Sequence, residues 1–191
     1  MKAPEGSYSA VLRSLASSHP LLRFAGIVLG SVVLALSAKI EVPFWPVPMT
    51  LETLAVLGLA GTFGAPLAGA AVLLWLAEGA AGLSVFAGVA AGPAYFLGPT
   101  GGYFAGFLAA ALLVGFAADR GLRARPFVLF GVMLGGVAVI YLCGAAWLAH
   151  LVGWERSFRL GVAPFVPADL TKAALAAALV TAGRRLGLQR G

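Results

Sequence analysis

The chain has 191 residues, of which 61% are apolar and only 10% are charged. A soluble globular protein needs more charged residues than this on its surface, so the composition indicates an integral membrane protein. The net charge of +6 does not indicate nucleic-acid binding, since the basic residues lie between the apolar runs and not along one face. Cys143 is the only cysteine, which excludes an internal disulfide and a multi-cysteine metal site.

The first half of the chain contains three apolar segments of unequal length. A spanning helix needs about 20 mostly apolar residues, and residues 21–38 meet this requirement before charge returns at Lys39. Residues 42–48 read VPFWPVP, and prolines at this density predict an extended loop. A shorter span is expected at 50–60, and a glycine-containing break separates it from a third span at 65–81.

The second half contains three further apolar segments after an irregular one. Residues 82–100 are rich in glycine and proline and carry no charge, which predicts a non-helical segment that folds back against the protein. Spans are then expected at 101–118, 126–151 and 164–182. The chain is therefore predicted to be an all-α integral membrane protein with six transmembrane helices.

The basic residues predict which side of the membrane each loop occupies, because short cytoplasmic loops carry the excess of Lys and Arg. With six spans, three basic clusters fall on one side: Arg13 and Arg23, then Arg120, Arg123 and Arg125, then Arg184, Arg185 and Arg190. The sequence thus predicts cytoplasmic N- and C-termini in the inner (plasma) membrane. A single membrane domain at 20–183 lies between tails at 1–19 and 184–191.

A signal peptide is the competing interpretation of the N-terminal region. Within residues 13–37, basic residues precede an apolar run that ends in small residues. Removing this segment would leave the new N-terminus outside the membrane with no charge asymmetry to account for it. A first transmembrane helix is therefore favoured over a signal peptide.

Charged residues of both signs gather at the predicted outer ends of the spans: Lys39, Glu41, Glu52, Glu78, Asp169 and Lys172. Ionisable groups in or near a bilayer are costly, so each one is a candidate functional residue. Asp169 and Lys172 are three residues apart and share one face of the last predicted helix. This spacing fits either an ion pair that anchors the helix end or a ligand site, and the depth of Lys172 in an apolar run favours the ligand site.

Aromatic residues concentrate in the two predicted outer loops and just after the second: Phe44, Trp45, Phe86, Tyr95, Phe96 and Tyr103. A single interfacial aromatic usually belongs to a membrane belt, but this concentration predicts a small apolar cavity with a few polar groups. Thr100 is expected to cap the fourth helix, leaving free amides from Gly101 onward for a carboxylate or a polar ring atom. Close helix packing is the alternative explanation of these glycines.

Gly26 and Gly30 form a small-xxx-small face on the first predicted helix, which permits tight contact within the bundle or with a partner subunit. The sequence contains no GxxxxGK[ST], GxSxG, HExxH or CxxC motif. It therefore supports neither an ATPase nor a protease or zinc enzyme, and no catalytic residue, cofactor or metal is expected.

Three segments resemble the BioY family. Residues 40–56, IEVPFWPVPMTLETLAV, match its I-x-[VI]-P-x-x-P-V-P-x-T-L-Q-T-L-A-V stretch, and residues 82–103 and 164–172 match in the same order. Two positions depart from the family pattern. Glu52 stands where Gln is common, which alters the charge near the predicted pocket, and Ala168 stands where Gly is frequent, which stiffens the start of the helix.

The resemblance extends over residues 25–182 and implies a biotin-binding S component of an energy-coupling factor transporter. Such a subunit captures biotin on the extracytoplasmic side. Import is driven by ATPase subunits through a transmembrane coupling subunit, and the resemblance leaves homo-oligomer formation open. A transporter for another small vitamin-like solute and a non-catalytic membrane assembly subunit are the alternative functions.

Biotin's chemistry suits the candidate residues that the resemblance singles out. Asp169 would accept the ureido N–H groups, and Lys172 would make a polar contact or hold Asp169 ionised. The expected substrate-binding residues are Asp169, Lys172, Tyr103, Thr100, Gly101, Phe86, Phe44 and Tyr95. Gly26 and Gly30 are expected to contact the coupling subunit.

Overall fold

The structure is a computed structural model that describes residues 20–89 and 91–185. Its elements are, in chain order, α2 (Pro20–Lys39), β1 (Glu41–Val42), β2 (Met49–Thr50), α3 (Glu52–Phe63), α4 (Ala65–Ala80), α5 (Pro93–Phe96), α6 (Gly101–Asp119), η1 (Leu122–Ala124), α7 (Pro126–Val152), α8 (Trp154–Gly161) and α9 (Val166–Arg185). The predicted tail at 1–19 lies outside the described residues. The predicted tail at 184–191 begins inside a helix, because α9 continues to Arg185.

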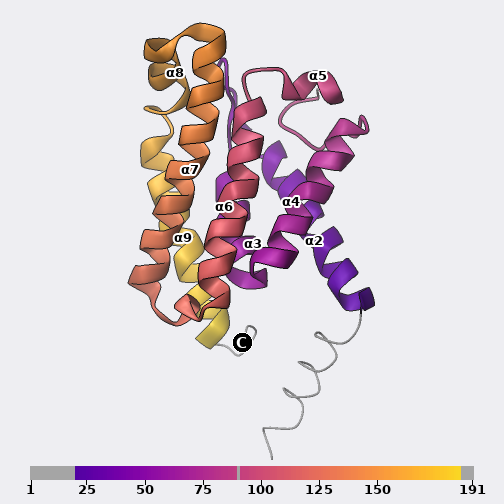
Figure 1. Cartoon of the computed structure of the whole chain (residues 1–191), viewed down its shortest axis with the longest axis vertical. Helices are drawn as coiled ribbons and strands as arrows, with labels where there is room; N and C mark the ends of the chain where they lie inside the picture. The colour runs from indigo at the N-terminus through magenta and orange to yellow at the C-terminus, as the bar shows by residue number, and fades with distance from the viewer. Residues whose placement is uncertain (1–19, 90, 186–191) are drawn as a thin grey trace, which may run out of the picture.

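A helix stands at each of the six predicted spans, and these helices run side by side (Figure 1). By length and composition, α2, α6, α7 and α9 can cross a membrane. Helix α3 has 12 residues and α4 has 16, so they are about 18 Å and 24 Å long against a hydrocarbon core of about 30 Å. The chain is an integral membrane protein, and the count of six complete spans stays a prediction.

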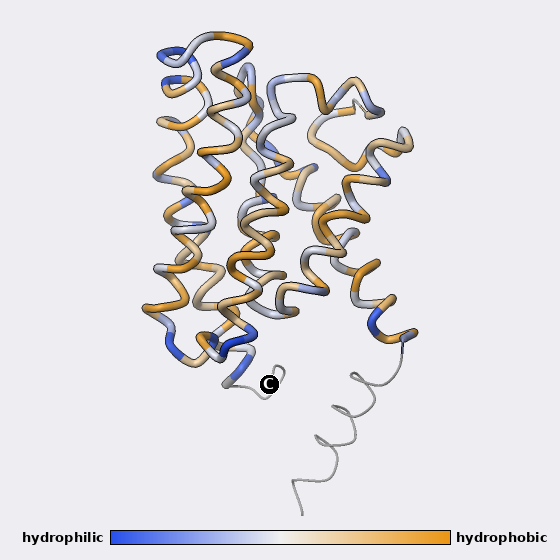
Figure 2. The backbone as a smooth tube through the Cα atoms, in the orientation of Figure 1, coloured by the Kyte–Doolittle hydropathy of each residue, from blue (hydrophilic) through white to orange (hydrophobic). Residues whose placement is uncertain are grey.

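Polar residues lie mostly at the two ends of the bundle, and apolar residues fill the length between them (Figure 2). We call one end the basic end, because it holds arginines of the α2 start, the α6–α7 connection and the α9 end: Arg23, Arg120, Arg123, Arg125 and Arg184. The other, the loop end, holds α5, α8 and the β1–β2 pair (Figure 1). This polarity is the arrangement that the charge distribution of the sequence predicts.

Two segments expected to lack helix contain one. No helix was expected between the predicted spans at 126–151 and 164–182, but Gly153 turns the chain with a φ of 85° and α8 follows. Helix α8 packs back on α7, where the Ser157 hydroxyl donates to the Ala145 carbonyl at 2.7 Å. The segment 82–100 is largely irregular, as predicted, except for the single turn of α5. Helix α8 is short and contains charged residues, and α5 is a single turn that follows Gly92. Neither therefore has the long apolar run of a spanning helix.

The break between α3 and α4 has a local cause at Gly64. This residue adopts a φ of 81°, a conformation that favours glycine. The side chain of Asp119, at the end of α6, occupies the space that a Cβ at Gly64 would need. An Asp119 oxygen accepts the Ala65 amide hydrogen at 2.9 Å and so caps the start of α4. The predicted break at residues 61–64 is confirmed at Gly64 alone, because α3 continues to Phe63.

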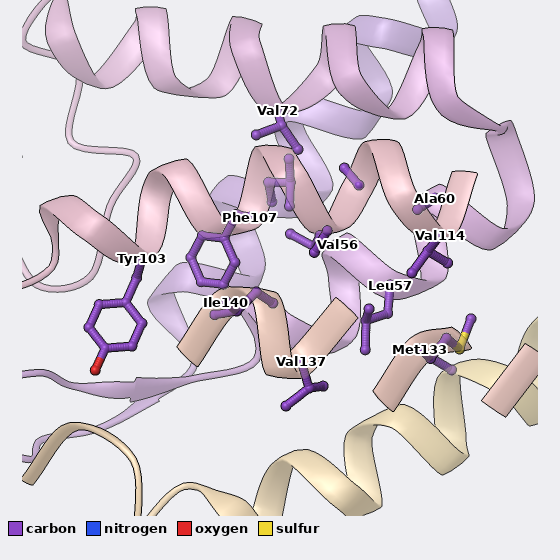
Figure 3. Packing of buried hydrophobic residues seen from close by; sticks show 14 of the residues in the cluster. Val56, Leu57, Ala60, Val72, Tyr103, Phe107, Val114, Met133, Val137 and Ile140 are labelled. Carbon is purple, nitrogen blue, oxygen red and sulfur yellow. The ribbon is translucent and has the colours of Figure 1, made fainter. Parts of the chain in front are cut away.

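The hydrophobic core lies where α3, α4, α6, α7 and α9 meet, and Figure 3 shows part of it. Helices α6 and α7 approach closely because Gly106 has no side chain. A Cβ on Gly106 would lie 2.7 Å from the Ile140 Cα. Phe107 of α6 and Ile140 of α7 are both buried beside this contact. Tyr103, one turn earlier on α6, continues the buried cluster toward the loop end.

Replacing Gly106 by leucine is expected to lower the apparent Tm of the detergent-solubilised protein by roughly 5–10 °C, because the added side chain must push apart two backbones. Gly131→Leu is the matched control on α7. A Cβ at Gly131 meets nothing within 4 Å, so that variant should melt like the parent. Tryptophan fluorescence during heating measures both, and equal melting of the two variants would contradict the packing argument.

Candidate ligand-binding site

A cavity near the loop end is enclosed by the β1–β2 segment and by parts of α3, α6, α7 and α9. The space between its walls is about 460 Å³ when open solvent is included, and the part in which a water molecule can be centred is about 30 Å³. Its lining residues are Val47, Pro48, Thr50, Glu52, Ala87, Tyr95, Thr100, Tyr103, Phe104, Phe107, Ile140, Tyr141, Phe165 and Asp169. The walls are thus mainly apolar and aromatic, with a small number of polar groups, as is usual for a small-molecule site.

Asp169 is the anionic group at the centre of a buried hydrogen-bond network. Its two oxygens accept hydrogen bonds from the Lys172 ammonium and from the Tyr141 hydroxyl, each at 2.7 Å. Lys172 also donates to the Thr50 carbonyl at 2.7 Å. Only 2% of Asp169 and 8% of Lys172 is exposed. The predicted Asp169–Lys172 pair is confirmed as an ion pair, and it ties α9 to α7 and β2.

The fold places the two members of this pair differently relative to the cavity. Asp169 lies in the first turn of α9, where the helix dipole favours a negative charge, and it lines the cavity. Lys172 is absent from the lining and lies behind Asp169. Its expected direct contact with a ligand is therefore not supported, whereas its expected role in holding Asp169 ionised fits the geometry.

Glu52 is a second buried carboxylate that lines the cavity, with 4% of its surface exposed. The Thr50 hydroxyl donates to it at 2.8 Å and accepts the Glu52 amide hydrogen at 3.2 Å. This turn at Thr50 joins β2 to α3 and orients the carboxylate inward. Because Thr50 also accepts from Lys172 through its carbonyl, the two carboxylates of the site are connected through Lys172 and Thr50.

Tyr103 lines the cavity with its ring, while its hydroxyl is already used in the fold. The hydroxyl donates to the Gly161 carbonyl at 2.7 Å. The ring lies directly against Gly144 of α7, where any Cβ would collide with it. Figure 3 shows Tyr103 one turn before Phe107 on α6. Tyr103 therefore supplies an aromatic wall and fastens α8 to α6.

The first of the amides predicted to be free at the start of α6, that of Gly101, is already hydrogen-bonded. Thr100 is the residue before α6 and lines the cavity, but its side chain makes no capping hydrogen bond. The Gly101 amide donates to the Gly98 carbonyl at 3.1 Å, and Gly101 is packed against the Phe96 backbone and the Trp147 indole. The alternative explanation, close packing, accounts for this glycine.

The predicted aromatic residues divide into lining and supporting groups. Tyr95 lines the cavity, and burial raises the pKa of its hydroxyl, so this group stays protonated at neutral pH. Phe86 is fully buried outside the lining, stacked on Tyr95 at 5.1 Å and edge-on to Trp75 at 5.1 Å. Phe44 is 43% exposed and packs 6.1 Å from Phe165. Phe86 and Phe44 thus support the site without lining it.

Lys39 fastens the segment 84–88 beside the cavity. Its ammonium donates to the Ser84 hydroxyl at 3.2 Å and to the carbonyls of Phe86 at 2.7 Å and Gly88 at 2.6 Å. Between these carbonyls lies Ala87, which lines the cavity. All three ammonium hydrogens have an acceptor, so this one side chain holds the wall segment against the end of α2.

Lys39→Met is expected to speed amide hydrogen exchange in residues 84–88 by roughly tenfold, because the loss of these hydrogen bonds lowers the cost of local opening by about 1–2 kcal/mol. Arg156→Gln is a control at the same end, since Arg156 is an exposed α8 residue. Mass spectrometry of deuterated peptides measures both variants. Unchanged exchange in Lys39→Met would show that the segment is held by other contacts.

Comparison with known proteins places this geometry in a family. The family model described as "BioY family" matches residues 12–188 of the chain. The chain belongs to the BioY family. The match covers α2 to α9 and therefore every element that borders the cavity. The resemblance seen in three segments is thereby confirmed over nearly the whole chain.

Relatives within the BioY family are named for biotin. A "Probable biotin transporter BioY" of Pyrococcus horikoshii is 39% identical over 142 residues, which cover 74% of this chain and 83% of that protein. A "Biotin transporter BioY" of Rhizobium etli is 34% identical over 165 residues, covering 82% and 86%. A similar fold occurs in the 2.1 Å crystal structure of the S component for biotin from an ECF-type ABC transporter, with a TM-score of 0.78, 27% identity, and 90% and 93% coverage.

The BioY-family site also contains residues that the sequence analysis did not select. They are Thr50, Glu52 and Tyr141 among the polar residues, and Val47, Pro48, Ala87, Phe104, Phe107, Ile140 and Phe165 among the apolar ones. Glu52 was predicted to alter the charge near the pocket but was given no role in binding. Tyr141 carries the one signal that was available, a hydroxyl group in the middle of a long apolar run. The apolar residues were indistinguishable from ordinary core residues.

The predicted partner contact at Gly26 and Gly30 needs correction. Gly30 is buried, and a Cβ there would lie 2.7 Å from the Ala71 Cβ of α4. Gly30 therefore serves packing inside this BioY-family fold and is not available to a partner subunit. A Cβ at Gly26 meets nothing within 4 Å, so that position remains open and its role stays a prediction.

Proposed function

We propose that this protein is the biotin-binding S component of an energy-coupling factor transporter. Biotin would enter the cavity at the loop end, and a transmembrane coupling subunit with ATPase subunits would drive import. The observation that carries the proposal is the buried Asp169 network in a cavity of otherwise aromatic and apolar walls. It occurs in a family whose named relatives are biotin transporters.

The chemistry of the cavity suits each part of biotin. The Asp169 carboxylate accepts the ureido N–H groups through charge-assisted hydrogen bonds. Lys172 and Tyr141 orient this carboxylate by donating to its two oxygens. Phe104, Phe107 and other apolar wall residues cover the fused rings and the alkyl chain. The hydroxyl groups of Tyr95 and Thr100 lie at the cavity wall, where they can donate hydrogen bonds to the polar atoms of biotin outside the ureido N–H groups.

The membrane arrangement completes the proposal. Six helices cross the inner (plasma) membrane, with α3 and α4 shielded by their neighbours where they are shorter than the bilayer. The basic end faces the cytoplasm, because short cytoplasmic loops carry the Lys and Arg excess. The cavity at the loop end is then open to the extracytoplasmic side, where an uptake system must capture its substrate.

Titration calorimetry of the purified detergent-solubilised chain tests this function directly. Biotin is expected to bind at one site per chain, while other vitamins of similar size do not compete. Binding of a different vitamin with no response to biotin would favour the second candidate, a transporter for another small solute. Absence of binding to any of them, in protein that melts cooperatively, would favour an assembly subunit and overturn the proposal.

A further inference from the structure

A second hollow lies at the basic end, between η1 and α9. It is lined by Arg123, Ala124, Thr181 and Arg184. One guanidinium nitrogen of Arg123 donates to the Asp119 carboxylate at 3.1 Å. The Nε of Arg123 is buried and has no hydrogen-bond acceptor among the described residues. A buried donor without an acceptor is costly, so the Arg123 guanidinium has hydrogen-bonding capacity that the described residues leave unused.

The charge around this hollow is favourable to an anion. Asp119 offsets part of the Arg123 charge, but none of the ion pairs found among residues 20–89 and 91–185 involves Arg184. Arg120 and Arg125 lie close by in the chain on the same connection. Arginine guanidinium groups match the geometry of a phosphate, to which they can donate paired hydrogen bonds.

An apolar groove shares helix α9 with this basic hollow. The groove runs between α2, α3 and α9 and is lined by Val33, Leu36, Ser37, Ile40, Leu51, Leu54, Ala55, Gly58, Leu59, Thr62, Leu179 and Val180. Val180 lines the groove and the next residue, Thr181, lines the basic hollow. Arg184 follows Val180 by four residues and so lies on the same helix face. Helix α9 therefore carries lining residues of both the groove and the basic hollow.

We propose that the groove and the basic hollow together bind one anionic phospholipid. Its phosphate contacts Arg123 and Arg184, and one acyl chain occupies the groove beside Gly58. A basic pocket near a helix end and an apolar groove along the same helix match a molecule with a phosphate at one end and a hydrocarbon chain at the other. Free phosphate would use the arginines but would leave the groove without a ligand.

Native mass spectrometry of the full chain tests the proposal, with dioleoyl phosphatidylglycerol as the probe and phosphatidylcholine of the same chains as the neutral comparison. The parent is expected to retain one phosphatidylglycerol and little phosphatidylcholine. Arg123→Gln/Arg184→Gln should weaken phosphatidylglycerol retention by about tenfold or more. The matched control is Arg120→Gln/Arg125→Gln, which removes the same charge at the same end from residues outside the lining and should change retention less than about twofold.

The groove is tested separately with Gly58→Leu. Gly58 lines the groove and a Cβ there meets nothing within 4 Å, so the new side chain fills the groove without colliding with the fold. It should weaken retention, whereas Gly131→Leu, in an equally open position on α7, should not. If Arg123→Gln/Arg184→Gln does not melt cooperatively, Arg184→Gln alone replaces it in the lipid-retention test. Arg184 is in none of the ion pairs of the described residues, so its replacement breaks no ion pair of the fold.

Four outcomes would overturn the proposal. Equal losses in the two arginine double variants would show diffuse attraction to the basic end. Equal retention of the two lipids would show that the charge is not recognised. Displacement of the lipid by millimolar inorganic phosphate would assign the site to the free ion, and unchanged retention in Gly58→Leu would remove the acyl chain from the groove.

Discussion

Replacing Asp169 by asparagine is expected to weaken biotin binding by roughly 10- to 100-fold, the effect of losing charge-assisted hydrogen bonds to a buried carboxylate. The asparagine side chain has nearly the same shape. Its oxygen can still accept one hydrogen bond, but it cannot replace the ionised group that both Tyr141 and Lys172 now contact at 2.7 Å. Titration calorimetry in detergent measures the affinity, and heating of the same sample reports whether the fold persists.

Asp119→Asn is the control for the loss of one carboxylate elsewhere in the bundle. Asp119 lies at the basic end, where it caps α4 and pairs with Arg123. This variant should lower the apparent Tm slightly and leave biotin affinity unchanged. If Asp169→Asn bound biotin as the parent does, the ureido contact would have to be assigned to another group, with Glu52 as the remaining carboxylate of the cavity wall.

The extent to which the site could be predicted depends on how local its contacts are. Asp169 and Lys172 are three residues apart, so helix geometry alone predicted their pairing. The Thr50 carbonyl that accepts from Lys172 is 122 residues away, and no local pattern connects the two. Tyr141 reaches Asp169 from another helix. The pair was therefore predictable, whereas the network around it required the tertiary structure.

The contrast between local patterns and contacts of distant segments also explains which parts of the fold could be predicted. The long helices follow from uninterrupted apolar runs, which admit no other structure in a bilayer. Helix α8 carries charged residues and lies beyond a glycine turn, so it showed no such run. The inward position of Phe86 depends on Gly79 of α4, where any Cβ would collide with the ring. Such pairings of a large and a small residue between distant segments leave no periodic signal in the chain.

Lys172→Met is expected to lower the apparent Tm by roughly 10 °C, because it leaves the Asp169 carboxylate buried with no counter-charge. Only 2% of Asp169 is exposed, so water cannot replace the lost ammonium. The Thr50 carbonyl also loses its donor from α9. Biotin affinity should fall as well, since the Asp169 carboxylate loses the Lys172 donor that helps to orient it.

The double variant Asp169→Asn/Lys172→Met separates the two roles of this pair. It removes both charges, so its apparent Tm should recover part of the loss seen in Lys172→Met. Its biotin affinity should stay as low as that of Asp169→Asn, because the group that accepts from the ligand is still missing. Recovery of affinity together with stability would mean that the ion pair only anchors α9, and that biotin is recognised by the rest of the cavity wall.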